Sequence, residues 1–321
     1  MGLAFLIAMT ALLITAPKLA PAADYPDKPL RFIVNFPPGG TADIIARLIG
    51  PKLGESLKQQ VIIDNRVGAS GNIGALAVAK ANVDGYTFGM FTSTQAISPA
   101  LFAKSPFDPV ADFAPITRLI SVPNLISVHP SVPATTLVEL IALAKAQPGK
   151  LSFGSAGTGT AVHLTGELLK SVAGIDILHI PYKGGGPAIT DLVGGQIPIG
   201  VQNISTIVNH VRAGRVRALG ISSLERSSAL PDVPTVASIG YPGFEANEWY
   251  GLVAPAATPR PIIDSLNREL VRIMRSPEIS ARMLDQGAVV VADAPNGFAA
   301  FIRNELEKWT RIARESGIRV E

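Results

Sequence analysis

The chain has 321 residues, of which 47% are hydrophobic and 17% are charged, so it is long enough for two domains with apolar cores. This composition excludes disordered and fibrous proteins. The net charge is only +3 and the Lys and Arg residues are scattered, which argues against nucleic acid as a partner. The sequence contains no cysteine, which excludes a thiol nucleophile and cysteine-ligated zinc.

The chain begins with an apolar run over residues 3–16, which is shorter than the roughly 20 residues of a membrane span. A small-residue site, Ala-Pro-Ala, follows at 20–22. This pattern is typical of a secretory signal peptide and predicts cleavage near Ala22 or Ala23, so residues 1–23 are excluded from the fold. Because no Lys or Arg precedes the apolar run, an upstream start codon and an uncleaved anchor remain alternatives.

Apolar, β-rich segments then alternate with helical patterns. We expect strands at 31–36, 61–65 and 86–91, with helices at about 42–58 and 72–81. Strands that repeat every 25 to 30 residues with helices between them indicate right-handed βαβ units and a parallel sheet.

A proline-rich passage at 105–133 suits connecting segments and a crossover, and a second such passage lies at 230–261. Between them a second alternation predicts strands at 151–155, 177–182, 197–202 and 216–222, and two helical stretches end the chain. The sequence therefore predicts two α/β lobes, each based on a parallel sheet and joined by two crossings. The expected division is lobe 1 at 24–122 and 247–321, and lobe 2 at 123–246.

Four glycine-rich turns follow predicted strands, at Pro37–Thr41, Arg66–Gly71, Gly154–Thr160 and Lys183–Pro187. Each lies where the carboxyl end of a strand meets the amino end of a helix, which is where ligands bind in open α/β sheets. Free backbone N–H groups at a helix start suit an anion. A single turn could need glycine for its backbone conformation alone, but four turns spread over two lobes favour an anion site.

Nucleotide phosphates fit these turns poorly. The pair Gly157 and Gly159 is followed by Val162 where a dinucleotide-binding motif needs its third glycine, and the P-loop pattern is absent. An exported protein also meets little ATP or NAD. The remaining candidate anion is a carboxylate.

Catalytic and metal-binding patterns are weak as well. Phe153 and Asn72 stand where the two nucleophile-elbow patterns need glycine. His163 and Glu167 are four residues apart on a helix and could share a metal, but the chain has four histidines and no H-E-x-x-H motif, so no metal site is expected. His163 either points toward the Ser155–Thr160 loop or is a hydrogen-bonded histidine at an interface.

An acid next to an anion site should repel the ligand, which makes Asp43 an objection to this interpretation. In the first helical turn its carboxylate can instead accept free N–H groups and complement the helix dipole, and we favour this capping role. Ser70, Thr158 and Thr160 are either caps or ligand contacts, and the sequence does not separate these roles.

Six segments, in order along the mature chain, resemble those of one known family: "YPDKPLRFIVNFPPGGTADIIARLI", "DNRVGASGNIGALAVAKANVDGYTF", "FDPVADFAPIT", "AQPGKLSFGSAGTGTAVHLTGELLK", "HIPYKGGGPAITDLVGGQI" and "RSSALPDVPTVASIGYPGFE". They are similar to the Bug-type (TctC-like) solute receptors of tripartite tricarboxylate transporters. The resemblance implies a bilobal type II periplasmic binding protein fold that closes on a small carboxylate. It also implies a periplasmic, monomeric receptor without catalysis or cofactor that delivers its ligand to a two-subunit membrane permease.

The resemblance also implies which residues bind. One ligand carboxylate is expected between a first-lobe loop and a second-lobe loop, with a third turn as an additional wall: Pro38, Gly39, Gly40, Thr41; Ser155, Ala156, Gly157, Thr158, Gly159, Thr160; and Tyr182, Lys183, Gly184, Gly185. Candidates for the distal end of the ligand lie at strand ends or the second crossing: Thr41, Ser93, Thr94, Asn203, Trp249. Arg66 could meet a second carboxylate, although a salt bridge to a neighbouring acid is favoured.

Two hypotheses from different classes therefore stand. The preferred one is a solute receptor, either for transport or for a sensor protein. The other is a secreted hydrolase or isomerase that uses Asp43 or His163 in the cleft.

Overall fold

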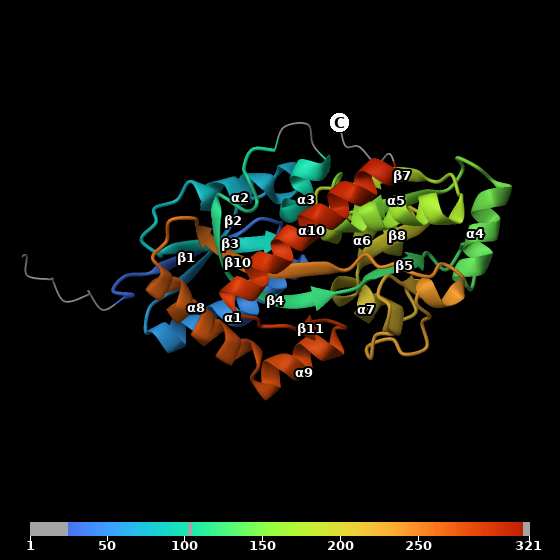
Figure 1. Cartoon of the computed structure of the whole chain (residues 1–321). Helices are drawn as coiled ribbons and strands as arrows, with labels where there is room; N and C mark the ends of the chain where they lie inside the picture. The colour runs from blue at the N-terminus through green and yellow to red at the C-terminus, as the bar shows by residue number, and fades with distance from the viewer. Residues whose placement is uncertain (1–24, 102–104, 317–321) are drawn as a thin grey trace, which may run out of the picture.

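The structure of the chain is a computed structural model that describes residues 25–101 and 105–316, so the predicted signal peptide lies outside the described residues. Two β-sheets lie side by side, and helices cover both faces of each (Figure 1). Within the described residues, no helix is both long and apolar enough to cross a bilayer.

The first lobe is built from both ends of the chain around a sheet with the strand order β11-β4-β10-β3-β1-β2. Strand β1 pairs in parallel with β2 and β3, whereas β10 is antiparallel to β3 and β4. Its elements are β1 Leu30–Val34, α1 Thr41–Leu57, β2 Val61–Asn65, the 3-10 turn η1 Ala69–Gly71, α2 Asn72–Ala79, β3 Thr87–Thr92, α3 Ser93–Leu101, β4 Phe113–Val122, β10 Glu248–Pro255, α8 Arg260–Met274, α9 Pro277–Asp285, β11 Val289–Val290 and α10 Pro295–Ser316.

The second lobe has the strand order β7-β6-β8-β5-β9. Strand β6 pairs in parallel with β7 and β8, and β5 is antiparallel to β8 and β9. Its elements are β5 Asn124–Val128, α4 Leu137–Ala146, β6 Ser152–Ser155, α5 Ala161–Ala173, β7 Leu178–Pro181, α6 Gly185–Val193, β8 Ile199–Asn203, α7 Ile204–Arg212, β9 Arg217–Ile221 and the 3-10 turn η2 Ala237–Ile239.

These two lobes confirm the predicted bilobal α/β fold and its two crossings. The sequence interpretation was wrong about the proline-rich passages, because they contain β4, β5 and β10, which make both sheets mixed. The prolines interrupt the apolar pattern without breaking the strands. Pro115, for example, lies in β4 opposite Val253, next to a register shift, and such irregularities tolerate the missing N–H.

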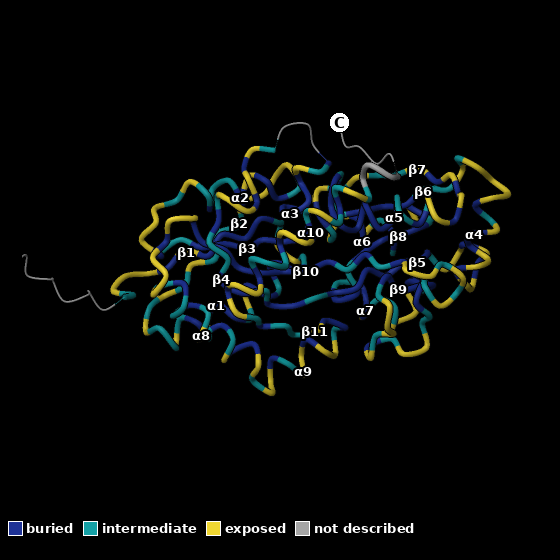
Figure 2. Tube along the Cα trace, viewed as in Figure 1, coloured by how far each residue is buried: buried dark blue, intermediate teal, exposed yellow. Residues whose placement is uncertain are grey.

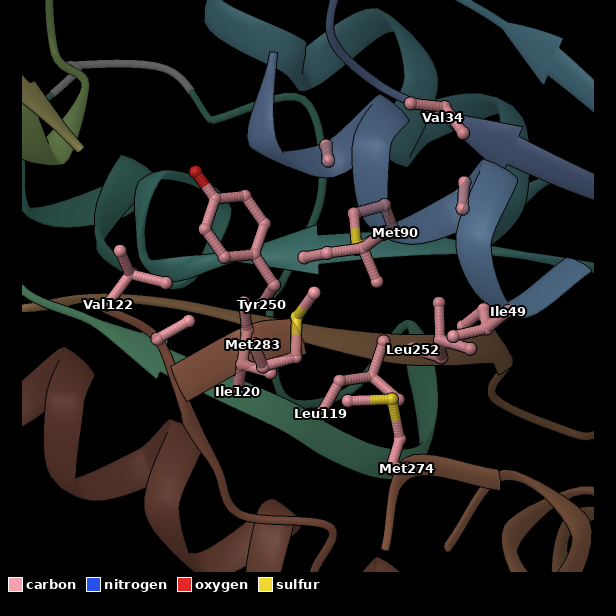
Figure 3. Close-up of a cluster of buried hydrophobic side chains, with 14 of the residues drawn as sticks. Val34, Ile49, Met90, Leu119, Ile120, Val122, Tyr250, Leu252, Met274 and Met283 are labelled. Carbon is pink, nitrogen blue, oxygen red and sulfur yellow. The ribbon is translucent and has the colours of Figure 1, made fainter. Parts of the chain in front are cut away.

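Apolar side chains on α1 and α8 pack on one face of the first sheet, including Ile45, Ile49 and Leu266. The same cluster continues into the second lobe through Leu125 and Ile204. Figure 3 shows Tyr250 with its ring against this cluster and its hydroxyl pointing away from the methionine side chains. Figure 2 shows the strands buried along the middle of the molecule and the exposed residues on the outer helices and loops.

Candidate functional site

A cavity lies between the two lobes, with a volume of about 40 Å³. Both lobes line it with loops and helix starts: Phe36, Pro37, Pro38, Gly40, Thr41, Ala42, Thr94, Glu248 and Tyr250 from the first lobe, and Ala156, Thr160, Val162, Gly185, Gly186, Gln202, Asn203 and Thr206 from the second. Ligand pockets typically hold about 300–1,000 Å³. The cavity is therefore small for a ligand site, because the lobes lie in contact here.

Five helices have an N-cap or first-turn residue in the lining of this cavity. In α3 the first two N–H groups are paired, that of Ser93 with Glu248 and that of Thr94 with Thr92, which leaves four helix starts for a ligand. The lining includes the N-cap or first turn of α1 at Gly40–Ala42, α5 at Thr160, α6 at Gly185–Gly186 and α7 at Asn203. No side chain caps α1, α6 or α7 through its N-cap residue. Helix starts carry unpaired N–H groups and a partial positive charge, so the four together favour an anion.

Asp43 holds the first-lobe loop, Pro38–Thr41, in place without lining the cavity. Its Oδ2 accepts the N–H of Gly39 at 3.1 Å and the Nε–H of Arg47 at 2.9 Å, and its Oδ1 accepts from Asn65 at 3.1 Å. Burial alone would raise the pKa of Asp43, but these hydrogen bonds and the Arg47 charge lower it. Asp43 does not line the cavity, and it accepts a backbone N–H as predicted, although this N–H belongs to Gly39, one residue before the N-cap Gly40.

The second-lobe loop, Ser155–Thr160, is held by its own hydrogen bonds. Ser155 Oγ accepts the N–H of Gly157 at 3.2 Å, and the hydroxyl of Thr160 donates to the Gly157 carbonyl at 2.6 Å while it caps α5. The N–H of Gly159 donates to Nδ1 of His163 at 3.1 Å. The N–H groups of both glycines are therefore already paired, and the loop meets the cavity through Ala156 and Thr160.

His163 thus supports the loop from below, which matches the first of its two predicted roles. Its ring stacks on His179 with centroids 3.9 Å apart, and His179 Nε2 lies 2.7 Å from Ser155 Oγ. Burial lowers the pKa of His163, and burial together with the neighbouring His163 lowers the pKa of His179 to about 3. Both rings are therefore neutral at pH 7, as the acceptor role of Nδ1 requires.

The loops of the two lobes touch each other beside the cavity. The hydroxyl of Ser70 in η1 donates to the Thr158 carbonyl at 2.6 Å. Gly184 lies so close to Pro37 that an added Cβ would be 3.0 Å from Pro37 Cγ. Thr158 is therefore an interlobe contact outside the cavity lining.

The third predicted wall contributes less than expected. The hydroxyl of Tyr182 donates to Asp191 at 2.7 Å, and burial and Asp191 raise the pKa of Tyr182 to about 12. Lys183 is exposed. Of the predicted turn, Gly185 lines the cavity, together with the next residue, Gly186, at the start of α6.

A polar network joins the lobes at one wall of the cavity. Thr41 Oγ1 lies 3.3 Å from Asn203 Oδ1 and 3.0 Å from Ser205 Oγ. The hydroxyl of Tyr250 donates to the same Asn203 oxygen at 2.6 Å, and Asn203 Nδ2 donates to Asn124 at 2.7 Å. Thr41 and Asn203, which the sequence singled out, are therefore brought together here.

The sequence missed Glu248, which lines the cavity with only 5% of its surface exposed. Its Oε1 accepts hydrogen bonds from the hydroxyl and N–H of Ser93 and from the N–H of Trp249. Thr94 also lines the cavity, and its buried Oγ1 has no hydrogen-bond partner among the described residues. Ser93 itself supports Glu248 and does not line the cavity.

Trp249 is not at the cavity. Side chains alternate between the two faces of a strand, so Glu248 and Tyr250 share the cavity face of β10 and Trp249 points the other way. Its ring packs against Phe298 and Phe301, and its Nε1 donates to Glu305 at 3.1 Å. The period of two along "EWYG" would have identified Glu248 and Tyr250 once 230–261 was read as containing a strand.

Arg66 forms the favoured salt bridge, with its Nε 2.9 Å from Asp64 Oδ2. In the part of the chain that the structure describes, no group of three or more His, Cys, Asp or Glu side chains could hold a metal ion. The cavity lining includes no Lys, Arg or His among these residues. The helix starts and the neutral polar side chains thus supply its attraction for an anion.

The chain is similar to known proteins over most of its length. Protein BugT of Bordetella pertussis is 37% identical over 302 residues, which cover 94% of this chain and 93% of BugT. Rpa4515 of R. palustris, solved with adipate, superposes with a TM-score of 0.89 at 35% identity over 92% of this chain and 99% of that one. MatC of Rhodopseudomonas palustris, solved with bound malate, gives 0.86 at 32% identity over 90% and 99%.

The model of one family, described as the tripartite tricarboxylate transporter family receptor, matches residues 45–318. This match covers most of the chain and includes three of the four helix starts that are left for a ligand. The chain belongs to the tripartite tricarboxylate transporter family of receptors.

Proposed function

We propose that this protein is a periplasmic receptor that binds a small organic carboxylate in the cavity between its lobes. The main support for this proposal is that four helix starts meet at a cavity lined by residues of both lobes. The adipate and malate in the related structures support a carboxylate as the ligand.

In this proposal the carboxylate accepts N–H groups from the start of α1 on one lobe and of α5 and α6 on the other. Thr41, Thr94 and Asn203 contact the remainder of the ligand. Of the other predicted residues, Gly39, Gly157, Gly159 and His163 shape the loops. Because complete binding needs both lobes, the ligand stabilises the closed state, in which Ser70 meets Thr158.

The proposal extends to location and partners. Residues 1–23 act as a signal peptide that is cleaved near Ala22 or Ala23, and the mature protein is a periplasmic monomer. It delivers its ligand to a two-subunit membrane permease, with lobe 1 formed by 24–122 and 247–321 and lobe 2 by 123–246. It performs no catalysis, because Asp43 and His163 hold backbone N–H groups instead of facing the cavity.

The test is a thermal-shift screen of C3 to C8 mono-, di- and tricarboxylates, hydroxy acids and amino acids, followed by calorimetric titration of the hits. A ligand at 100 times its Kd should stabilise the folded protein by about 2.7 kcal/mol. Folded protein whose melting temperature stays constant across the whole panel would refute the proposal. Incubating the best-binding acid with the protein and analysing it by mass spectrometry tests the enzyme alternative, which predicts a product.

A further inference from the structure

Glu248 is a carboxylic acid inside a cavity that we propose binds a carboxylate, and in its charged form it should repel the ligand. Together with Tyr250 it supplies the titratable side chains among the lining residues. No described lysine, arginine or histidine forms an ion pair with it, although the structure contains many such pairs elsewhere, including Arg47 with Asp43. A buried acid without a cationic partner favours its neutral form.

The two oxygens of Glu248 have different surroundings. Oε1 accepts three hydrogen bonds, from the Ser93 hydroxyl, the Ser93 N–H at 3.1 Å and the Trp249 N–H at 3.1 Å. Oε2 has no hydrogen-bond partner among the described residues, and protein atoms do not enclose it completely. In a neutral acid the proton must therefore sit on Oε2, and Oε2 is the atom left for a ligand.

The Thr94 hydroxyl gives an independent indication of a ligand at the same place. Thr94 is 1% exposed, follows Ser93 in the chain and lines the cavity, and its Oγ1 lacks a partner among the described residues. A buried hydroxyl without a partner is costly unless a bound molecule supplies one. Thr94 Oγ1 and Glu248 Oε2 thus belong to two residues of the same cavity lining, and each lacks a partner that a ligand can supply.

We propose that Glu248 binds the ligand as a neutral acid, with Oε2–H donating a hydrogen bond to a ligand oxygen, so that binding takes up a proton from solution. The proton stays bonded to Oε2, and no other bond forms or breaks. This inference rests on the proposed carboxylate receptor and narrows its ligand. The ligand must present a second oxygen acceptor, such as a second carboxylate, to Glu248 instead of an ammonium group.

The groups around Glu248 agree with proton uptake near neutral pH. Burial and the nearby Glu305 of α10 raise the pKa of Glu248 to about 7, against the opposing hydrogen bonds from Ser93 and Trp249. Glu305 Oε1 lies 3.6 Å from Lys308 Nζ. Tyr250, which lies on β10 with Glu248, stays protonated because burial raises its pKa. His163 and His179 lie behind the second-lobe loop, and their pKa values are lowered.

The experiment is calorimetric titration of adipate and of malate at pH 7.0 and 8.5, in Tris and in triethanolamine. Both buffers are cationic in their acid forms, so they do not compete for an anion site, and their ionisation enthalpies differ. The difference in apparent binding enthalpy between the buffers counts the protons taken up. We expect about half a proton per ligand at pH 7.0, nearly one at pH 8.5, and an affinity that falls about tenfold per pH unit above 7.5.

Two variants complete the test. Glu248→Gln keeps an acceptor for Ser93 and an N–H donor for the ligand, and it should abolish proton uptake and bind more tightly than wild type at pH 8.5. Glu305→Gln removes a carboxyl outside the cavity lining that helps to raise the pKa of Glu248, so proton uptake should persist at pH 8.5 and exceed half a proton at pH 7.0. Binding of either acid without proton uptake in the wild-type protein overturns the inference and leaves the receptor function intact. Absence of binding by the whole carboxylate panel instead refutes the receptor function itself.

Discussion

A methyl group added at Gly184 should weaken ligand binding by hindering lobe closure, and this effect can be measured separately from its effect on folding. The residue has φ 119° and ψ 169°, a region that is open to glycine and costs other residues about 1–3 kcal/mol. A Cβ there would lie 3.0 Å from Cγ and 3.2 Å from Cδ of Pro37 on the other lobe. The backbone strain affects the folded protein whether or not the lobes touch, whereas the contact with Pro37 exists only when they meet.

Carbon atoms prefer separations of about 3.5–4.0 Å, so the Gly184→Ala methyl overlaps Pro37 by roughly half an ångström. Overpacking of this kind costs about 1–3 kcal/mol. Since the clash is confined to the closed state, it should weaken carboxylate binding by about 5- to 150-fold. The assay is calorimetric titration of the best-binding acid, with urea unfolding of the free protein to measure the strain separately.

Gly240→Ala is the matched control, because Gly240 also has a positive φ, of 115°, while its Cβ would meet nothing within 4 Å. It should lower stability and leave affinity unchanged. If Gly184→Ala binds the acid as tightly as wild type, or if Gly240→Ala loses affinity equally, the assignment of closure to the Pro37–Gly184 contact is wrong.

Three further outcomes test the loops and the core. Since the native pKa values of His163 and His179 lie below the 6.5 of the unfolded chain, the unfolded state binds more protons as the pH falls. Their contribution to stability is therefore lost below pH 6.5, and the acid-side fall in melting temperature should be smaller in His163→Asn, whose amide oxygen can still accept the Gly159 N–H. Ser70→Ala removes an interlobe hydrogen bond and should weaken binding about 2- to 10-fold in the same titration, with little change in urea stability. Trp249→Phe should lower the free energy of unfolding by about 1–3 kcal/mol, by removing the shorter of the two indole hydrogen bonds to Glu305, and a change in affinity above twofold would place this residue nearer the ligand than the structure does.

The parallel parts of both sheets were predictable because apolar, β-rich runs alternated with helical patterns and were followed by glycine-rich turns, as after Val34 and at Ser155. Strands β4, β5 and β10 were missed because the proline-rich passages that contain them were interpreted as connecting segments and a crossover. That error removed β10 from the prediction and with it Glu248, since alternation can assign faces only within a recognised strand.

The helix starts at the cavity were predictable from the turns, but the use of each N–H group was not. Gly157 and Gly159 were expected to bind ligand, yet their N–H groups donate to Ser155 and His163. Two features decide which N–H groups form hydrogen bonds within the loop. One is the positive φ values, here 134° for Gly157 and 76° for Gly159, and the other is the side chains that pack on the side of the loop away from the cavity. A linear sequence specifies neither.

The single residue Pro123 separates β4 of the first sheet from β5 of the second. Two peptide units span at most about 7 Å, so Val122 and Asn124 cannot move apart when the lobes open. Motion at this connection is restricted to rotation, and the ring of Pro123 removes much of the freedom in φ. The lobes should therefore open by rotating about a hinge at Pro123, so that a ligand enters from the side opposite Pro123 and neither sheet slides along the other.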